Sequence, residues 1–157
     1  MATTNFFAFK LVSVLGCALV AGVFFAFSTF VMSALQRLQP SQGIAAMQSI
    51  NITAINPLFM TALFGTAAIC IALVVSSLLK WCQPNNTYLL LGSSIYLLGT
   101  VGVTIICNVP LNDALAIVKP DSTEGASLWV LYLAKWTFWN HIRTLAALTA
   151  AALLTLA

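Results

Sequence analysis

Charged side chains are scarce in this sequence. Only 6% of its 157 residues are charged, comprising three acidic and six basic residues, and there is a single histidine. A soluble domain of this length usually has about a quarter charged residues, so a water-soluble globular fold is excluded. No run of basic residues is present, which argues against nucleic acid as a partner. We expect a multi-pass integral protein of the plasma (inner) membrane, with the lipid bilayer as its surroundings.

Spacings typical of metal sites are also missing. The four cysteines show no C-x-x-C pattern, and a zinc site normally needs three or four protein ligands. His141 is the only histidine, and no carboxylate cluster accompanies it. We therefore expect no metal cofactor. Haem, which needs only an axial ligand, stays open as an alternative through His141.

Long apolar runs take the place of charge, since 61% of the residues are hydrophobic. A membrane-spanning helix needs about 20 mostly apolar residues. Runs over residues 11–35, 58–79 and 88–107 satisfy this, and a fourth helix over 129–157 is long enough if it includes the polar segment at its start. The first run is longer than the apolar core of a signal peptide, so we expect it to remain as a span. The prediction is an all-α integral membrane four-helix bundle that forms a single domain over residues 1–157.

The connections between these spans carry turn signals. Gln39-Pro40-Ser41-Gln42-Gly43 predicts a turn in which Ser41 caps a short extramembrane helix between spans 1 and 2. Pro84-Asn85-Asn86 predicts a tight turn, which makes spans 2 and 3 antiparallel neighbours. Pro110 is expected to end the third span, because it removes a backbone donor from the helix.

Four antiparallel spans would bring most of the polar side chains to one membrane face. The end of span 1, the start of span 2, the end of span 3 and the start of span 4 all lie there. These segments contain Arg37, Asn51, Asn56, Asn108, Asn112, Trp136, Trp139, Asn140, His141 and Arg143. The opposite face receives no comparable cluster, so this face is the candidate site.

Helical spacing arranges part of this cluster as a stripe. Trp129, Tyr132, Trp136, Asn140 and Arg143 advance by three, four, four and three residues, which places them on one face of a helix. An aromatic belt at the membrane interface accounts for the three aromatic residues without any function. The asparagine and the arginine lie deeper, where polar groups need protein partners.

Several motifs together resemble a known family. They are Gly22-Val23-Phe24-Phe25-Ala26-Phe27-Ser28, Met47-Gln48-Ser49-Ile50-Asn51, Asn56-Pro57, Asn108-Val109-Pro110-Leu111-Asn112 and Trp136-x-x-Trp139-Asn140-x-x-Arg143. This pattern is similar to that of a bacterial family of uncharacterised four-helix membrane proteins related to the fungal anthrone oxygenases. The resemblance covers nearly the whole chain, with Ser33 as a departure at a position where proline is expected.

The resemblance implies the oxidation of an anthrone-like polycyclic aromatic by dioxygen, without a metal or flavin. His141 would accept the proton of the central methylene, and the polar groups that would stabilise the resulting oxyanion are Arg143, Asn108, Asn112 and Asn140. Trp136 and Trp139 would stack on the ring system. The substrate contacts are completed by Asn51 and Asn56.

Two alternatives stay open at this stage. The same polar cluster would suit a non-catalytic membrane protein that binds a lipid, a quinone or a partner helix. His141 would also suit a small haem or quinone redox protein, or it would be a hydrogen-bonded histidine at the membrane interface without a function. A homo-oligomer is compatible with either function.

Overall fold

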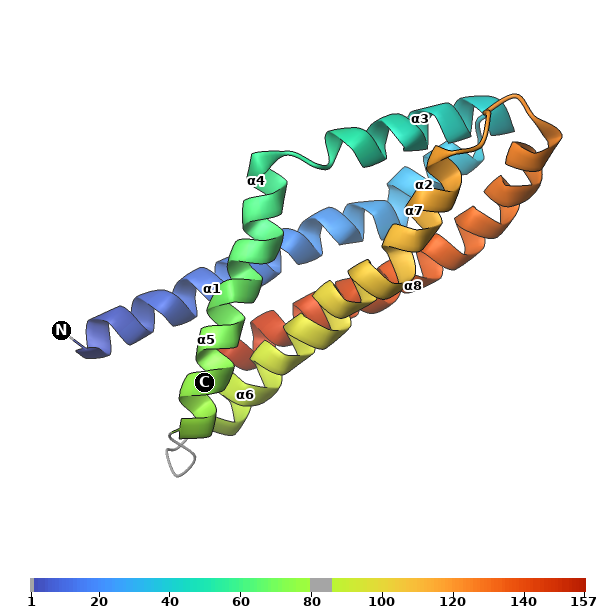
Figure 1. The fold of residues 1–157 in the computed structure, drawn as a ribbon. Coiled ribbons are helices and arrows are strands. Elements are labelled where there is room, and N and C mark those ends of the chain that lie inside the picture. Colours follow the sequence, from blue (N-terminus) through green and yellow to red (C-terminus); the bar gives the residue numbers. More distant parts are fainter. Residues whose placement is uncertain (1, 80–85) are drawn as a thin grey trace.

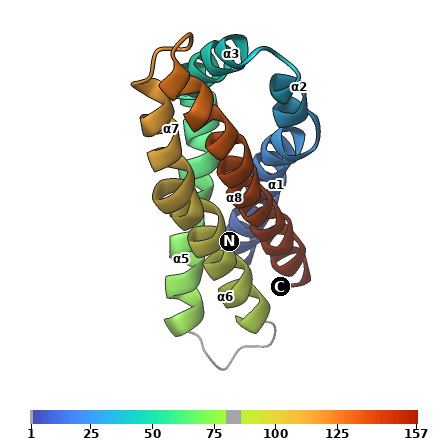
Figure 2. The same cartoon turned by 90° about the vertical axis from the view of Figure 1, so that its right-hand side faces the viewer.

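The computed structural model describes residues 2–79 and 86–157, and side chains from Phe7 onward. Within these residues the chain forms four long helical rods and one shorter helix, with no strand. The rods lie side by side, and the shorter helix α3 lies across one end of the bundle (Figures 1 and 2). The predicted Pro84-Asn85-Asn86 turn lies outside the described residues, except for Asn86, where α6 begins.

Three of the rods contain π-helical turns. The first comprises α1 (Ala2–Ala26), η1 (Phe27–Val31) and α2 (Met32–Gln36). The second comprises α4 (Pro57–Met60), η2 (Thr61–Gly65) and α5 (Thr66–Leu79). The third comprises α6 (Asn86–Ile95), η3 (Tyr96–Gly102), η4 (Thr104–Asn108) and α7 (Val109–Ala116). The fourth rod is α8 (Thr123–Leu156), and the short helix is α3 (Pro40–Thr53).

Among the described residues, three segments are long and apolar enough to cross a membrane, namely Phe7–Gln36, Pro57–Leu79 and Asn86–Ala116. They correspond to the first three predicted spans. The helix α8 is 34 residues long and combines apolar residues with polar ones such as Lys135, His141 and Arg143. It packs along α1 and α6, so the C-terminal helix is part of the bundle (Figure 2).

The third rod does not end near Pro110 as expected, but continues to Ala116. Just before the proline, the Val109 backbone N–H donates to the Thr104 carbonyl, a π-type bond that spans five residues. This wider turn shifts the hydrogen-bond ladder by one residue. The helix therefore passes the proline, which occupies the first turn of α7 and has no N–H to satisfy there.

The helix α3 begins two residues earlier than expected. Its N-terminal cap position is Gln39, with Pro40 in the first turn and no side-chain cap bond, so Ser41 does not cap it. Further along, Gln48 Nε2 donates to the carbonyl oxygens of Leu115 (2.8 Å) and Val118 (3.0 Å). These bonds satisfy carbonyls at the end of α7, which joins α3 to the third rod.

The apolar core is divided into two clusters. One, around Val20, Cys70 and Tyr96, joins α1, α5, η3 and the end of α8. The other, around Met47 and Tyr132, joins α2, α3, α7 and the start of α8. The polar segment of α8 lies between the two clusters.

Candidate functional site

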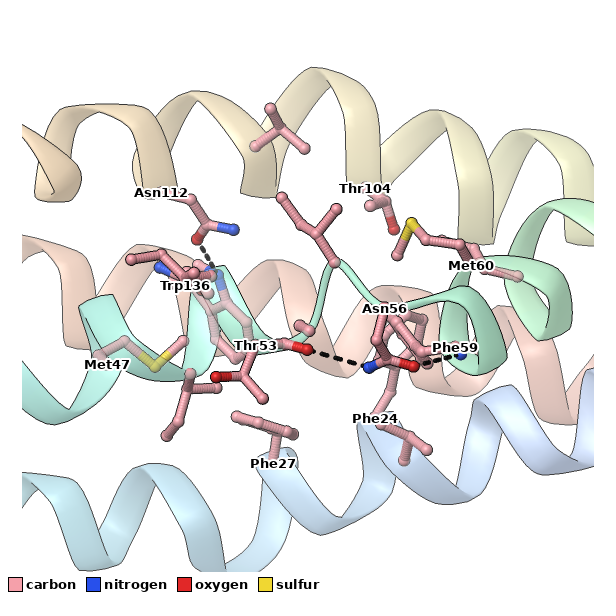
Figure 3. A pocket seen from close by; sticks show the side chains of 18 of the residues that line it. Phe24, Phe27, Met47, Thr53, Asn56, Phe59, Met60, Thr104, Asn112 and Trp136 are labelled. Atoms are coloured by element: carbon pink, nitrogen blue, oxygen red, sulfur yellow. Dashed lines mark hydrogen bonds between the residues drawn. The ribbon is translucent and has the colours of Figure 1, made fainter.

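A cavity of about 810 Å³ lies between the two core clusters. It is bounded by all four rods and by α3, and the start of the second rod contributes Phe59 and Met60 to its wall (Figure 3). Its wall is mainly apolar, and its size is in the range of cavities that hold small-molecule ligands. The polar lining residues are Gln48, Asn51, Thr53, Asn56, Thr104, Asn112, Asp113 and Arg143.

Arg143 is the buried charge of this cavity. Only 5% of its side chain is exposed. Its Nε donates to Asn140 Oδ1 (2.9 Å) and its Nη1 to Thr104 Oγ1 (3.3 Å), so both hydrogen-bond partners are neutral. Among the described residues no carboxylate pairs with it. A buried guanidinium without an opposite charge is costly in an apolar environment, and it favours an anionic ligand.

Aromatic rings partly compensate the Arg143 charge. The guanidinium carbon lies 3.9 Å from the centre of the Phe24 ring and 4.8 Å from that of the Trp136 ring. Such cation–π contacts are attractive, but they do not neutralise the charge. They hold the planar guanidinium between two aromatic walls of the cavity.

Asn140 orients Arg143 and joins α8 to the first rod. Its Nδ2 donates to the Phe24 carbonyl and to Ser28 Oγ, both at 2.7 Å, which leaves its Oδ1 to accept from Arg143. The side chain is fully buried and does not line the cavity. Because both ends of the amide are satisfied, Asn140 is placed to support Arg143 and not to contact a ligand.

Asn112 orients the aromatic residues at the other end of the cavity. Its Oδ1 accepts from Tyr132 Oη and from Trp136 Nε1, both at 2.8 Å. Figure 3 shows the Trp136 bond, with the amide nitrogen of Asn112 turned away from it. Because its oxygen already accepts twice, the NH2 group is the part of this side chain available as a donor to a ligand.

The other asparagines have different environments. Asn51 is half-buried and lines the cavity. Asn56 lines it too, but caps α4 by accepting from the Phe59 N–H (3.0 Å). Asn108 is fully buried outside the cavity wall and donates to the Trp136 carbonyl (3.2 Å), and its side-chain oxygen has no hydrogen-bond partner in the described part of the chain.

His141 and Trp139 are not brought to the cavity. His141 is exposed on α8, and Trp139 is half-buried with its ring edge-on to Phe138 at 5.2 Å. Neither lines the cavity. The reason is helical periodicity: the inward stripe runs through Trp136, Asn140 and Arg143, and residues 139 and 141 are rotated about 100° to either side of Asn140. The expected role of His141 as proton acceptor therefore does not fit this geometry.

Sequence reasoning missed the aromatic and hydroxyl residues that complete the wall. Phe24, Phe27 and Thr104 line the cavity, and Phe27 and Thr104 belong to the π-helical turns η1 and η4. Such turns occur frequently at functional sites because they re-aim neighbouring side chains. Thr104 lies four residues before Asn108, a spacing that could have drawn attention to it.

Comparison with known protein families gives a match over more than half of the chain. The model of the anthrone oxygenase family matches residues 58–153. This range includes Asn112 and the polar stripe of α8, whereas the first rod and α3 lie outside it. No curated protein matches the chain, and no solved structure matches it.

Proposed function

Because the chain belongs to the anthrone oxygenase family, we propose that it is a membrane-embedded oxygenase that oxidises an anthrone-like polycyclic aromatic with dioxygen. The observation that carries the proposal is Arg143, a buried cation without a carboxylate partner among the described residues, on the wall of an apolar cavity. An anthrone becomes an anion during oxidation, and the cavity offers the charge that this anion needs.

The proposal includes a four-span bundle in the membrane, with α3 outside the hydrocarbon. At about 1.5 Å per residue, α8 is about 50 Å long, more than the roughly 30 Å of a bilayer core. Its polar residues Asn140 and Arg143 are buried in the protein, and leucines such as Leu145 and Leu148 are exposed. The low hydropathy of α8 thus comes in part from an inward stripe, which supports a fourth span. We propose the plasma membrane as its location.

The cavity wall suits a flat aromatic ligand. Phe27 and Trp136 have ring centres 5.6 Å apart at the cavity, and aromatic faces of this kind stack on polycyclic rings. In the proposed complex the ligand's carbonyl oxygen points to Arg143, and the Asn112 amide donates to a second oxygen substituent. The remaining contacts are apolar.

The proposed reaction removes a proton from the central methylene of the anthrone. The electron pair delocalises onto the carbonyl oxygen as an enolate, which the Arg143 guanidinium stabilises. The electron-rich carbon then forms a C–O bond with dioxygen, and the resulting peroxide anion takes up a proton, which replaces the one removed from the methylene. The hydroperoxide loses the remaining hydrogen of this carbon and its outer oxygen as water and becomes the second carbonyl. One methylene and one O2 thus become one carbonyl and one water. The carbanion supplies the electrons, so we propose that no resident metal or flavin is required.

The test is turnover of anthrone by the purified protein in lipid nanodiscs, followed by oxygen uptake and quinone absorbance over a protein-free blank. We expect Arg143→Met to lower the rate about 100-fold or more, because removing one oxyanion-stabilising group costs that much in other enzymes. The matched control is Arg37→Met, which removes an exposed arginine outside the cavity and should keep the rate.

Absence of turnover by the unchanged protein would overturn the proposal and favour a protein that binds a lipid, a quinone or a partner helix without catalysis. A Soret band in the visible spectrum would instead indicate haem and contradict the cofactor-free reaction.

A further inference from the structure

The proposed oxidation needs a proton acceptor, and the exposed position of His141 leaves that role open. Among the described residues that line the cavity, only Asp113 and Arg143 carry side chains that ionise. Arginine stays protonated in proteins and accepts no proton. The carboxylate of Asp113 is therefore the one side chain of the cavity wall suited to take a proton from a ligand.

We propose that Asp113 is the catalytic base, an assignment that rests on the function proposed above. Asp113 is exposed in α7 and lines the cavity beside Asn112, so it stands at the rim. No hydrogen bond or ion pair with another described residue occupies its carboxylate. Glu124 and Asp121, the other acidic residues, do not line the cavity.

Asp113 and Arg143 lie at different depths of the cavity. The guanidinium donates a hydrogen bond to Thr104, and Asp113 lies nine residues after Thr104 in the third rod. At about 1.5 Å per residue this is a distance of about 13 Å along the helix. The cavity thus has a cation in its interior and a carboxylate at its rim.

The positions of these two charges correspond to the two reacting groups of an anthrone. The carbonyl and the methylene of the molecule lie at opposite positions of the central ring. With the carbonyl oxygen at Arg143, the methylene points toward the rim and Asp113. The C–H bond breaks, its proton passes through a water molecule at the rim to an Asp113 carboxylate oxygen, and its electron pair moves through the ring to the oxygen at Arg143. At the rim Asp113 can then release the proton to water.

The test separates proton abstraction from oxidation. Under argon in D2O, the protein should exchange the methylene hydrogens of anthrone for deuterium, which NMR measures against a protein-free blank. We expect Asp113→Asn to lower both this exchange and aerobic turnover by about 100-fold or more near neutral pH, as loss of a general base does. Binding of the anthraquinone product, measured by quenching of tryptophan fluorescence, should stay unchanged because Asn keeps the size of the side chain.

The pH dependence of turnover is a second measurement. It would stay the same as in the unchanged protein if Asp113 had only a structural role. Anthrone ionises in solution as the pH rises, so the turnover deficit of Asp113→Asn should shrink toward about pH 9. Asp121→Asn removes the same charge from an exposed position outside the cavity and should behave like the unchanged protein.

The outcomes separate this inference from the proposed function. Exchange and turnover by Asp113→Asn at the unchanged rate would overturn the role of Asp113 alone. The role of Asp113 as base would also be wrong if the turnover deficit of Asp113→Asn stayed constant with pH, or if the variant lost quinone binding to the same extent. If the unchanged protein neither exchanges nor oxidises anthrone, both proposals fall.

Discussion

Arg143 shows how a polar side chain can be held in an apolar protein without an opposite charge. A charged residue at the centre of a bilayer costs about 3 kcal/mol or more when it has no partners. Here the guanidinium donates hydrogen bonds to two neutral acceptors and contacts two aromatic rings. The positive charge itself remains uncompensated within the described chain, so the residue is available to an anion.

Replacing Asn140 with Asp tests this idea directly. One oxygen of the new carboxylate would take the position from which Oδ1 now accepts the Arg143 Nε–H at 2.9 Å, and its charge would neutralise the guanidinium. The other oxygen would replace the NH2 group, which removes the bond donated to the Phe24 carbonyl and leaves the Ser28 hydroxyl as a possible donor. We expect the affinity for an anionic phenolic ligand to fall at least about tenfold, since the ligand competes with a built-in ion pair. The measurement is a titration by tryptophan fluorescence in nanodiscs. Equal affinity in the variant would show that Arg143 does not act as the counter-charge.

Among the helices, glycines set how closely two rods approach. A Cβ added at Gly99 in η3 would lie 2.6 Å from the Ala146 Cβ of α8, too close for two carbon atoms. Gly22, also within a helix, has nothing within 4 Å of such a Cβ. The two glycines therefore have different roles, although the sequence presents both as small residues in a span.

This contrast gives a matched pair of variants. We expect Gly99→Ala to lower the free energy of unfolding by about 1–3 kcal/mol, because overpacking pushes the third rod away from α8. Gly22→Ala should be neutral or slightly stabilising, because alanine is the better helix former. Unfolding in mixed detergent micelles, followed by circular dichroism, measures both. Equal stability of the two variants would contradict the close packing of η3 on α8.

The number of membrane spans decides on which side of the membrane each end of the described chain lies. Three apolar helices are long enough to cross a membrane, and the inward-facing stripe of α8 supports a fourth crossing. An even number of spans places both ends of the described chain on the same side of the membrane. If α8 lay on the surface, the ends would be on opposite sides.

Reporter fusions at either end of the chain distinguish these topologies. A reporter that is active only in the cytoplasm and one that is active only outside it, each fused before residue 1 or after residue 157, should place both ends in the same compartment. The physical reason is that Asn140 and Arg143 are buried and hydrogen-bonded inside the bundle, so neither side chain faces lipid when α8 crosses the membrane. Opposite locations of the two ends would rule out the four-span arrangement.

The amino-acid sequence by itself determined the helical class and the inward stripe of α8. Both follow from composition and from helical period, which are local properties: long apolar runs predict helices, and the spacing of Trp129, Tyr132, Trp136, Asn140 and Arg143 predicts one face. All five are buried on that face.

Only the tertiary structure decided which polar side chains meet. It turned His141 and Trp139 away from the cavity, carried the third rod past Pro110, and brought the Phe24 ring against Arg143. It also left Arg143 without an acidic partner among the described residues while placing Asp113 at the cavity rim. These outcomes depend on the rotation and the register of one helix against another, which are set by packing between residues far apart in the chain.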